Sequence, residues 1–315
     1  MARPALAALA LVLALALAAC RTAAAPQSGR PGSRPVDRAS AVDDAALARW
    51  RGLLGKGAAL PPPAEAGELL RRLEPVLADP DPARRDGIAY EVYARLLLAD
   101  GAVTDADVAA LRDRLVARTA AEPVAGDAVF GRSFAALVLS VIAAREVAHP
   151  AWDPAALDAQ IAAATAYAAR EVDLRGYTGA TGWAHAAAHT ADWLKFLARH
   201  PALTSAQAVR LLDGVTSLVA RAHGTRFAWG EDERLAAAAR AVLRRGLVDE
   251  AGIDAWLARV GAPLASGWPD PFDARVFATQ RNARDLLVSL FVALSFDDAA
   301  PAAAALARLR AFMAS

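Results

Sequence analysis

Residues 127–147 read DAVFGRSFAALVLSVIAAREV, a long segment in which apolar side chains recur with helical spacing. It is apolar enough to lie at the centre of a protein core. Further helical-period segments of about 12 to 22 residues lie before and after it, separated by short breaks rich in Pro, Gly and Asp. No stretch alternates convincingly between apolar and polar residues, as a half-buried strand would. The sequence therefore predicts an all-α protein.

The helices are expected to pair into hairpins. The periodicity predicts about twelve helices, over residues 44–54, 64–77, 83–98, 104–119, 127–147, 155–172, 183–199, 204–222, 232–245, 249–260, 273–295 and 301–313. They would form about six antiparallel hairpins of about 45 residues, a spacing that suits an α-solenoid of the HEAT or armadillo kind. A closed α/α toroid built from the same hairpins is the alternative.

The first residues indicate export. Arg3 precedes an unbroken apolar run over residues 5–19, which is too short for a membrane span of about 20 residues. The run ends in LAAC, residues 17–20, which resembles the lipobox of bacterial lipoproteins. Cys20 is the only cysteine. We expect residues 1–19 to be a lipoprotein signal peptide, with an ordinary signal peptide or an anchor helix as the alternative.

The segment after Cys20 is expected to be a tether. Lipidation of Cys20 would anchor the chain to the cell envelope by burying acyl chains in the bilayer. Arg21, rather than Asp, follows it, which points to the periplasmic side of the outer membrane in a double-membrane bacterium. Residues 20–42 are rich in Pro, Gly and Ser, as flexible linkers are. Residues 43–315 are expected to form one helical repeat domain. Basic and acidic residues number 35 and 34, a balance that argues against nucleic-acid binding.

The segment with most chemical potential is GWAHAAAHTAD, residues 182–192, which holds two of the five histidines. On a helix, His185, His189 and Asp192 would share one face. Histidines at i and i+4 can bind one zinc or similar divalent ion. Ala186 stands where zinc proteases of that pattern carry a glutamate, so a third ligand would be Asp192 or a carboxylate from another helix. Alternatively, both histidines simply bond neighbouring loops.

A glycine-bearing loop over residues 177–182 leads into this predicted helix. Thr181 is a candidate helix cap. Trp183 is either a core residue or part of a site. Asp173 and Arg175 are expected to form an ion pair that braces the loop.

Acidic residues open the helix predicted from residue 232. Glu231 and Asp232 suit the positive end of a helix dipole, which is the plainer interpretation. The functional interpretation is that one of them faces His185 and His189 and completes a metal or acid–base site.

Other candidates have weaker support. Arg132 lies in the apolar segment and needs a buried partner, for which Asp86 is a candidate. Asn282 would line a groove or bond a loop backbone. Ser133 and Ser289 lack the sequence context of a nucleophile elbow, which argues against a serine hydrolase.

Several segments together resemble the uncharacterised bacterial family known as domain of unknown function 2785, over about residues 65 to 297. The resemblance rests on Arg85-Asp86, Val129 to Phe134, Asp173 to Tyr177, Gly182 to His185, Ala188 to Asp192, Glu231 to Ala236, Arg281-Asn282 and Ser289-Leu290. It implies an all-α, repeat-like fold and assigns no activity.

Two functional hypotheses follow. The first is a membrane-anchored lipoprotein that binds a peptide, a protein or a small molecule in a groove centred on His185, His189 and Asp192. The second is a metal-dependent hydrolase, in which the two histidines hold the ion and Glu231 or Asp232 activates water.

Overall fold

The computed structural model describes residues 42–222 and 224–314. The expected signal peptide (1–19), Cys20 and all of the expected tether except residue 42 therefore lie outside the described residues, as does His223.

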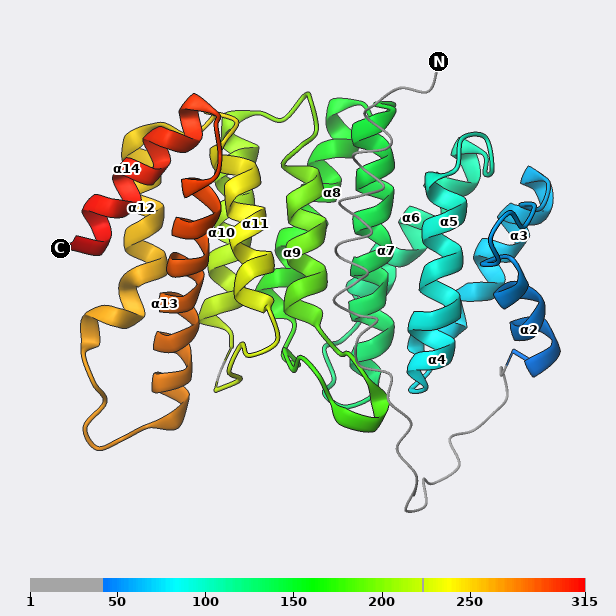
Figure 1. The fold of residues 1–315 in the computed structure, drawn as a ribbon, viewed down its shortest axis with the longest axis horizontal. Helices are drawn as coiled ribbons and strands as arrows, with labels where there is room; N and C mark the ends of the chain where they lie inside the picture. The colour runs from blue at the N-terminus through cyan, green and yellow to red at the C-terminus, as the bar shows by residue number, and fades with distance from the viewer. Residues whose placement is uncertain (1–41, 223, 315) are drawn as a thin grey trace.

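The described chain is all-α, as predicted (Figure 1). Its only β-pairing within the described residues is an isolated bridge between Tyr177 and Trp183. The helices are α2 (Asp44–Gly52), α3 (Pro63–Leu73), η1 (Glu74–Ala78), α4 (Pro82–Arg84), η2 (Arg85–Tyr90), α5 (Glu91–Leu98), α6 (Asp105–Thr119), α7 (Ala128–Ala148), α8 (Pro154–Arg170), η3 (Gly179–Thr181), α9 (Ala186–Leu197), α10 (Ser205–Ala220), α11 (Glu231–Leu243), α12 (Glu250–Gly261), η4 (Ala262–Ser266), α13 (Ala274–Ser295) and α14 (Ala300–Ala314).

Side-chain caps set many of the helix starts. The side chains of Asp43, Thr104, Asp153 and Asp249 each accept a hydrogen bond from a backbone N–H of the first turn that follows them. Thr204 forms a complete capping box with the third residue of α10. Such caps satisfy N–H groups that have no partner inside the helix, so the helix begins where the capping residue stands.

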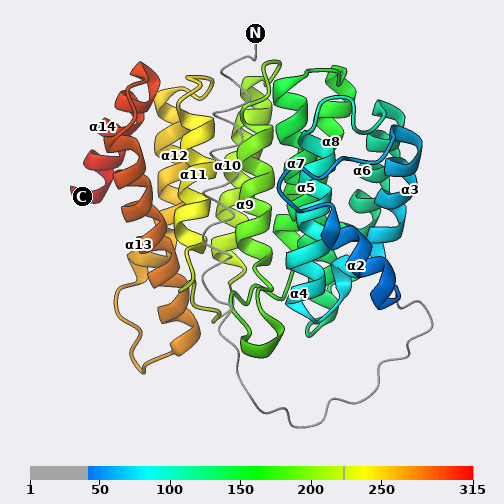
Figure 2. The ribbon, with the colours of Figure 1, turned by 45° about the vertical axis from the view of Figure 1, so that its right-hand side comes forward.

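The helices form two rows. α5, α7, α9, α11 and α13 pack against one another in that order, and α6, α8, α10, α12 and α14 form the second row against them. α2 and α14 lie at opposite ends of the molecule in both views (Figures 1 and 2). A closed toroid would bring the first and last helices together, so this arrangement favours an open array. The finer assignment to HEAT or armadillo repeats stays a prediction.

α7 is a core helix, as the apolar segment predicted. It packs against α5, α6 and α9. It is the one described helix long and apolar enough to cross a membrane by length and composition, yet 89% of its apolar window is buried inside the protein. Its apolar character is explained by this burial, because its neighbours cover it on several sides.

Candidate functional site

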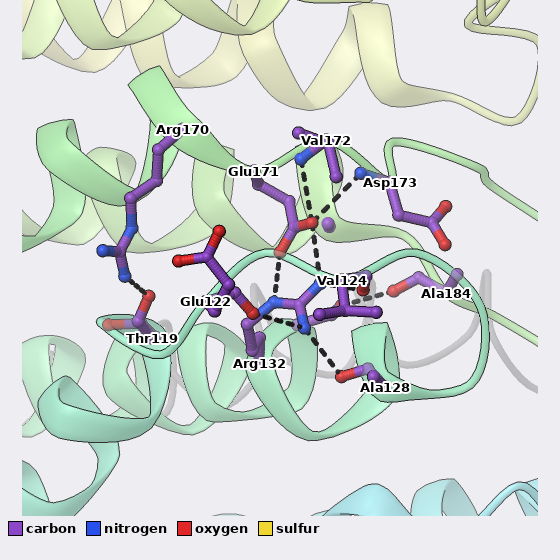
Figure 3. A network of polar contacts seen from close by, with 12 residues as sticks. Thr119, Glu122, Val124, Ala128, Arg132, Arg170, Glu171, Val172, Asp173 and Ala184 are labelled. Atoms are coloured by element: carbon purple, nitrogen blue, oxygen red, sulfur yellow. Dashed lines mark hydrogen bonds and ion pairs between the residues drawn. The ribbon is translucent and has the colours of Figure 1, made fainter.

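The loop between α8 and α9 is fastened to α7 by a buried ion pair. Arg132 Nε and Nη2 lie 2.7 and 2.9 Å from the two carboxylate oxygens of Glu171, and both side chains are almost fully buried (Figure 3). Arg132 also donates to the carbonyls of Val124 and Ala128, at 2.8 and 3.2 Å. The prediction that Asp86 is the partner of Arg132 is wrong. Asp86 instead lies beside Arg85, its neighbour in the chain.

Asp173 and Arg175 form the ion pair expected from the sequence. Arg175 Nε lies 2.8 Å from Asp173 Oδ1, and Arg175 Nη2 lies 2.6 Å from Asp173 Oδ2. Asp173 Oδ2 also accepts from the Gly126 N–H, at 3.1 Å. This pair ties the start of the loop to the chain just before α7.

The loop then folds back on itself and ends in a strained residue. The N–H groups of Ala184 and His185 each lie 2.9 Å from a carbonyl, those of Gly176 and Arg175. His185 has a φ of 51°, and it is the only non-glycine residue with positive φ in the described part of the chain. This left-handed conformation costs about 1–2 kcal/mol for an L-residue. The helix expected from Trp183 therefore begins only at Ala186, with His185 at its N-cap.

This finding corrects the expected geometry of the two histidines. The i,i+4 argument requires both residues to be helical, and His185 is not. The His185 and His189 rings still lie near each other, with centroids 5.8 Å apart and planes at 77°. Thr181 does not cap the helix, because its hydroxyl lies 2.8 Å from that of Thr178.

The Arg85 side chain binds the backbone of the loop between α8 and α9, near Thr181. It lies in the π-helical segment η2, and its Nη2 donates to the carbonyls of Thr181 and Trp183, at 2.9 and 3.3 Å. Its guanidinium also lies over the ring of Phe130, 4.0 Å from the centroid. Burial raises the pKa of Asp86 to about 6, although the neighbouring Arg85 charge opposes that shift.

His185 pairs with Glu231, the first residue of α11. His185 Nε2 lies 3.4 Å from Glu231 Oε1 and 3.3 Å from the Trp229 carbonyl oxygen. Both neighbours are acceptors, so Nε2 carries a proton and faces them as the donor. Nδ1 is buried and has no hydrogen-bond partner among the described residues. The structure thus brings Glu231, one of the two predicted carboxylates, to this histidine.

The Glu231 carboxylate is held in its charged form. Burial favours the neutral acid, but the close contact with His185 and the backbone N–H groups of Trp229 and Glu231 outweigh burial and lower the pKa of Glu231. The Trp229 N–H donates to Glu231 Oε2 at 2.8 Å. The sequence interpretation of Glu231 as a helix-start acid also agrees with its place in the first turn of α11.

Three aromatic rings surround this pair. The Trp183 ring stacks on His185, with centroids 4.5 Å apart. Tyr177 lies 4.9 Å from Trp183 and 5.7 Å from Trp229, and the two tryptophan rings are 6.1 Å apart. Trp229 is 50% exposed. A Cβ at Gly176 would collide with the Trp229 ring and with Glu231 Oε1, so only glycine lets the loop approach this closely. We refer to Tyr177, Trp183 and Trp229 as the aromatic cluster.

His189 belongs to a different, buried contact, with Ser133. Its Nδ1 lies 2.7 Å from Ser133 Oγ and 3.2 Å from the Ser133 carbonyl oxygen, while Ser133 Oγ donates to the Ala184 carbonyl. Because two acceptors face Nδ1, it carries the proton. Burial and the nearby His185 hold the pKa of His189 well below its usual value. The sequence around Ser133 argues against a nucleophile, and its one hint of a buried partner is the position of this serine within an apolar segment.

Asp192 does not join the histidines. Its carboxylate contacts Lys195 and Arg234 and is almost completely buried. Burial opposes ionisation, but the charges of Lys195 and Arg234 outweigh it and lower the pKa of Asp192. Asp192 therefore links α9 to α11 rather than orienting an imidazole.

Asp232 and Asn282 both make contacts that join α13 to the start of α11 or to the loop before it. Asp232 Oδ2 accepts from the Ser289 hydroxyl at 2.6 Å, so this carboxylate does not face His185. Asn282 is fully buried and binds the backbone of the loop before α11, with Phe227 N–H and the Thr225 carbonyl each 2.8 Å away. Two roles were predicted for Asn282, and the structure confirms the one in which it bonds a loop backbone.

The predicted zinc site is not formed by these side chains. Among the described residues, no group of three His, Cys, Asp or Glu side chains is placed to hold a metal ion. His185 and Glu231 are in contact, but His189 Nδ1 is engaged by Ser133, and Asp192 is engaged by two cations. The donor set that zinc requires in a hydrolase is therefore incomplete here.

The fold and the site together define an all-α protein of two helical rows, with a buried histidine–glutamate pair beside a partly exposed aromatic cluster. The chain belongs to the protein family of unknown function DUF2785, whose profile matches residues 123–292. The match runs from just before α7 into α13 and includes His185 and Glu231, whereas Arg85 lies outside it. No curated protein and no solved structure matches the chain.

Proposed function

We propose that this protein is a lipid-anchored envelope protein whose helical domain binds a ligand at the aromatic cluster, beside His185 and Glu231. The observation that carries the proposal is the His185–Glu231 contact of 3.4 Å next to a half-exposed Trp229. Ligand binding is favoured over metal-dependent hydrolysis, because the described side chains do not supply three metal ligands.

The energetic cost of this arrangement supports a functional role. An unpartnered buried nitrogen such as His185 Nδ1 costs about 1–3 kcal/mol, and the left-handed backbone costs about 1–2 kcal/mol more. Strain and unsatisfied polar groups of this kind cluster at functional sites. A ligand whose polar group reaches Nδ1 would recover part of this cost.

The chemistry of the site defines the ligand class. An exposed tryptophan face offers a large apolar contact that loses little entropy on binding. His185 Nδ1, which is buried without a partner, is the ring atom open to a hydrogen bond from a ligand. These features favour a ligand with a flat ring face and O–H or N–H donors, such as an oligosaccharide, over a simple cation that binds aromatic faces alone.

The ligand proposal can be tested by titrating the full-length protein, in a neutral detergent, with chitotriose and separately with choline while following tryptophan fluorescence. We expect chitotriose to change the emission and Trp229→Ala to abolish that change. Glu231→Gln should weaken binding about tenfold or more, since a charge-assisted contact is lost. Trp268→Phe is the matched control, because Trp268 is 70% exposed and lies outside the cluster. Equal responses from Trp229→Ala and Trp268→Phe would contradict the proposal, as would a response to choline alone.

The anchor is proposed from the sequence around Cys20. Acyl labelling of the cells and globomycin treatment test it directly. We expect label on the wild-type protein and none on Cys20→Ser, together with a precursor that accumulates under globomycin. Unchanged labelling and mobility of Cys20→Ser would refute the anchor without bearing on ligand binding.

A further inference from the structure

Four arginines converge on one cavity at the opposite end of α9 from His185. The cavity has a volume of about 290 Å³ and is lined by Arg199, Arg240, Arg244 and Arg245. Arg199 follows the last turn of α9, and the other three lie at the end of α11. At 1.5 Å per residue, the length of α9 places this cavity about 20 Å from His185. It is therefore separate from the aromatic cluster.

One carboxylate serves two of these arginines. Asp297 Oδ2 lies 2.6 Å from Arg240 Nε and 3.5 Å from Arg244 Nε, and the Asp297 side chain is 1% exposed. A single negative charge shared by two guanidinium groups leaves the pair of arginines with a net positive charge. The chain as a whole carries almost equal numbers of basic and acidic residues, so this excess is local.

Arg245 has a structural role. It donates to the carbonyls of Ala198 and His200, at 3.0 and 2.8 Å, and so satisfies backbone groups at the end of α9. A cation is favourable at the C-terminal end of a helix, and this accounts for Arg245 without any ligand.

Arg199 also stands at the C-terminal end of α9, but its side chain does not bond the carbonyls there. Among the described residues it makes no ion pair and no hydrogen bond through its side chain, and its guanidinium lies 5.0 Å from the Phe196 ring. Burial, followed by the charges of Arg244 and Arg240, lowers the pKa of Arg199. The negative charge of Asp192 opposes this shift, but Asp192 is already paired with Lys195 and Arg234. Arg199 therefore faces other cations without a counter-ion of its own.

We propose that this cavity binds the phosphate group of a small phosphate monoester, with Arg199 and Arg244 as its principal ligands. The planar guanidinium fork matches two phosphate oxygens at once. Arg199, Arg240 and Arg244 line the cavity beside the single negative charge of Asp297, so two positive charges remain, and a dianion offsets both where a single carboxylate would not. The volume lies near the lower end of the range for ligand pockets, about 300–1,000 Å³, so the rest of the molecule is small.

The phosphate could belong to a soluble metabolite or to a lipid headgroup, and calorimetry on the full-length protein in a neutral detergent separates the two. The probes are orthophosphate, glycerol 3-phosphate and dihexanoyl phosphatidic acid, with glycerol as the uncharged control. We expect glycerol 3-phosphate to bind and glycerol not to bind. Tighter binding of the phosphatidic acid by about tenfold or more would assign the site to a lipid. Equal affinities for glycerol 3-phosphate and the phosphatidic acid would assign the site to a soluble phosphate. Absence of heat with all three phosphates would overturn the proposal.

Arg199→Gln is the decisive variant, and Arg259→Gln is its matched control. Arg259 is a half-exposed arginine paired with Asp213, so its loss changes the net charge equally, away from the cavity. We expect Arg199→Gln to weaken phosphate binding about tenfold or more and Arg259→Gln to leave it unchanged. Equal weakening by both variants would mean general charge attraction and would overturn the proposal.

Thermal unfolding keeps the test independent of folding defects. Because Arg199 makes no hydrogen bond to the described protein, Arg199→Gln should melt at the wild-type temperature, or slightly above, in phosphate-free buffer. Added glycerol 3-phosphate should raise the melting temperature of wild type and Arg259→Gln but not that of Arg199→Gln. A variant that melts well below wild type without ligand would show a structural role for Arg199 and refute the assignment.

Discussion

Replacing Glu171 by Gln tests whether the buried contact with Arg132 holds the loop before α9 in place. The substitution keeps the shape of the side chain and removes its charge. Arg132 would remain in a site where only 5% of its side chain is exposed. Glu171 also accepts from the N–H groups of Val172 and Asp173, at 2.9 and 3.0 Å, and these contacts would weaken with the loss of charge (Figure 3).

The magnitude follows from burial. Breaking a buried ion pair from one side costs about 3–5 kcal/mol, because the remaining charge cannot be hydrated. We expect a decrease of this size for Glu171→Gln and a similar one for Arg132→Met. The double variant should cost about as much as one single change, since the second removes no further pair. A typical domain has a free energy of unfolding of about 5–15 kcal/mol, so the effect is large.

Urea denaturation followed by circular dichroism measures these free energies. Asp213→Asn is the control, because it breaks a pair of similar length, 2.7 Å, in which both side chains are about half exposed. That variant should lose less than about 1 kcal/mol. The reasoning is refuted if Glu171→Gln costs no more than Asp213→Asn, or if the two buried single changes are additive in the double variant.

Three further predictions concern the site. Burial raises the pKa of Asp86 to about 6, so the folded protein binds a proton at this carboxyl more tightly than the unfolded chain does. The stability that this proton contributes is lost as pH rises from about 4 through about 6. Asp86→Asn should therefore become more stable relative to wild type across that interval, by up to about 3 kcal/mol in urea titrations, and a constant difference would contradict this. Ser133→Ala removes the hydroxyl that faces His189 and should cost about 1–3 kcal/mol, more than Ser140→Ala, whose hydroxyl bonds only within its own helix. His185→Asn and His185→Val both lose the contact with Glu231, so their difference reports on the backbone. We expect His185→Val to be about 1–2 kcal/mol less stable than His185→Asn, because asparagine tolerates the left-handed region and β-branched residues do not. Equal stabilities of the two variants would rule out backbone strain.

Much of the fold was accessible from local sequence patterns. Helix formation depends on residues within one or two turns, so apolar periodicity and capping residues located nearly every helix. α7 and α10 illustrate this, since the apolar run predicted the first and the helical-period segment over residues 204–222 predicted the second. The residues that resemble DUF2785 likewise predicted the family that the profile match shows. The segment around His185 was also recognisable, because histidines are rare in this chain.

The partners of the site residues were not accessible in this way. Nothing in the sequence distinguishes Glu171 from Asp86 as the acid for Arg132, because both lie far from it along the chain and only packing brings one within 2.7 Å. The helical geometry assumed for His185 failed because the backbone contacts of the loop with Arg175 and Gly176 override the local preference for helix.

Sequence alone determined the helices, the family and the segment that carries the two histidines, because periodicity, caps and motifs are properties of neighbouring residues. Tertiary structure alone decided that His185 meets Glu231, that Asp192 is neutralised elsewhere, and that Arg199 faces arginines from α11. Those contacts join helices separated by dozens of residues, and their energies depend on distance and burial, which arise only when the two rows pack together.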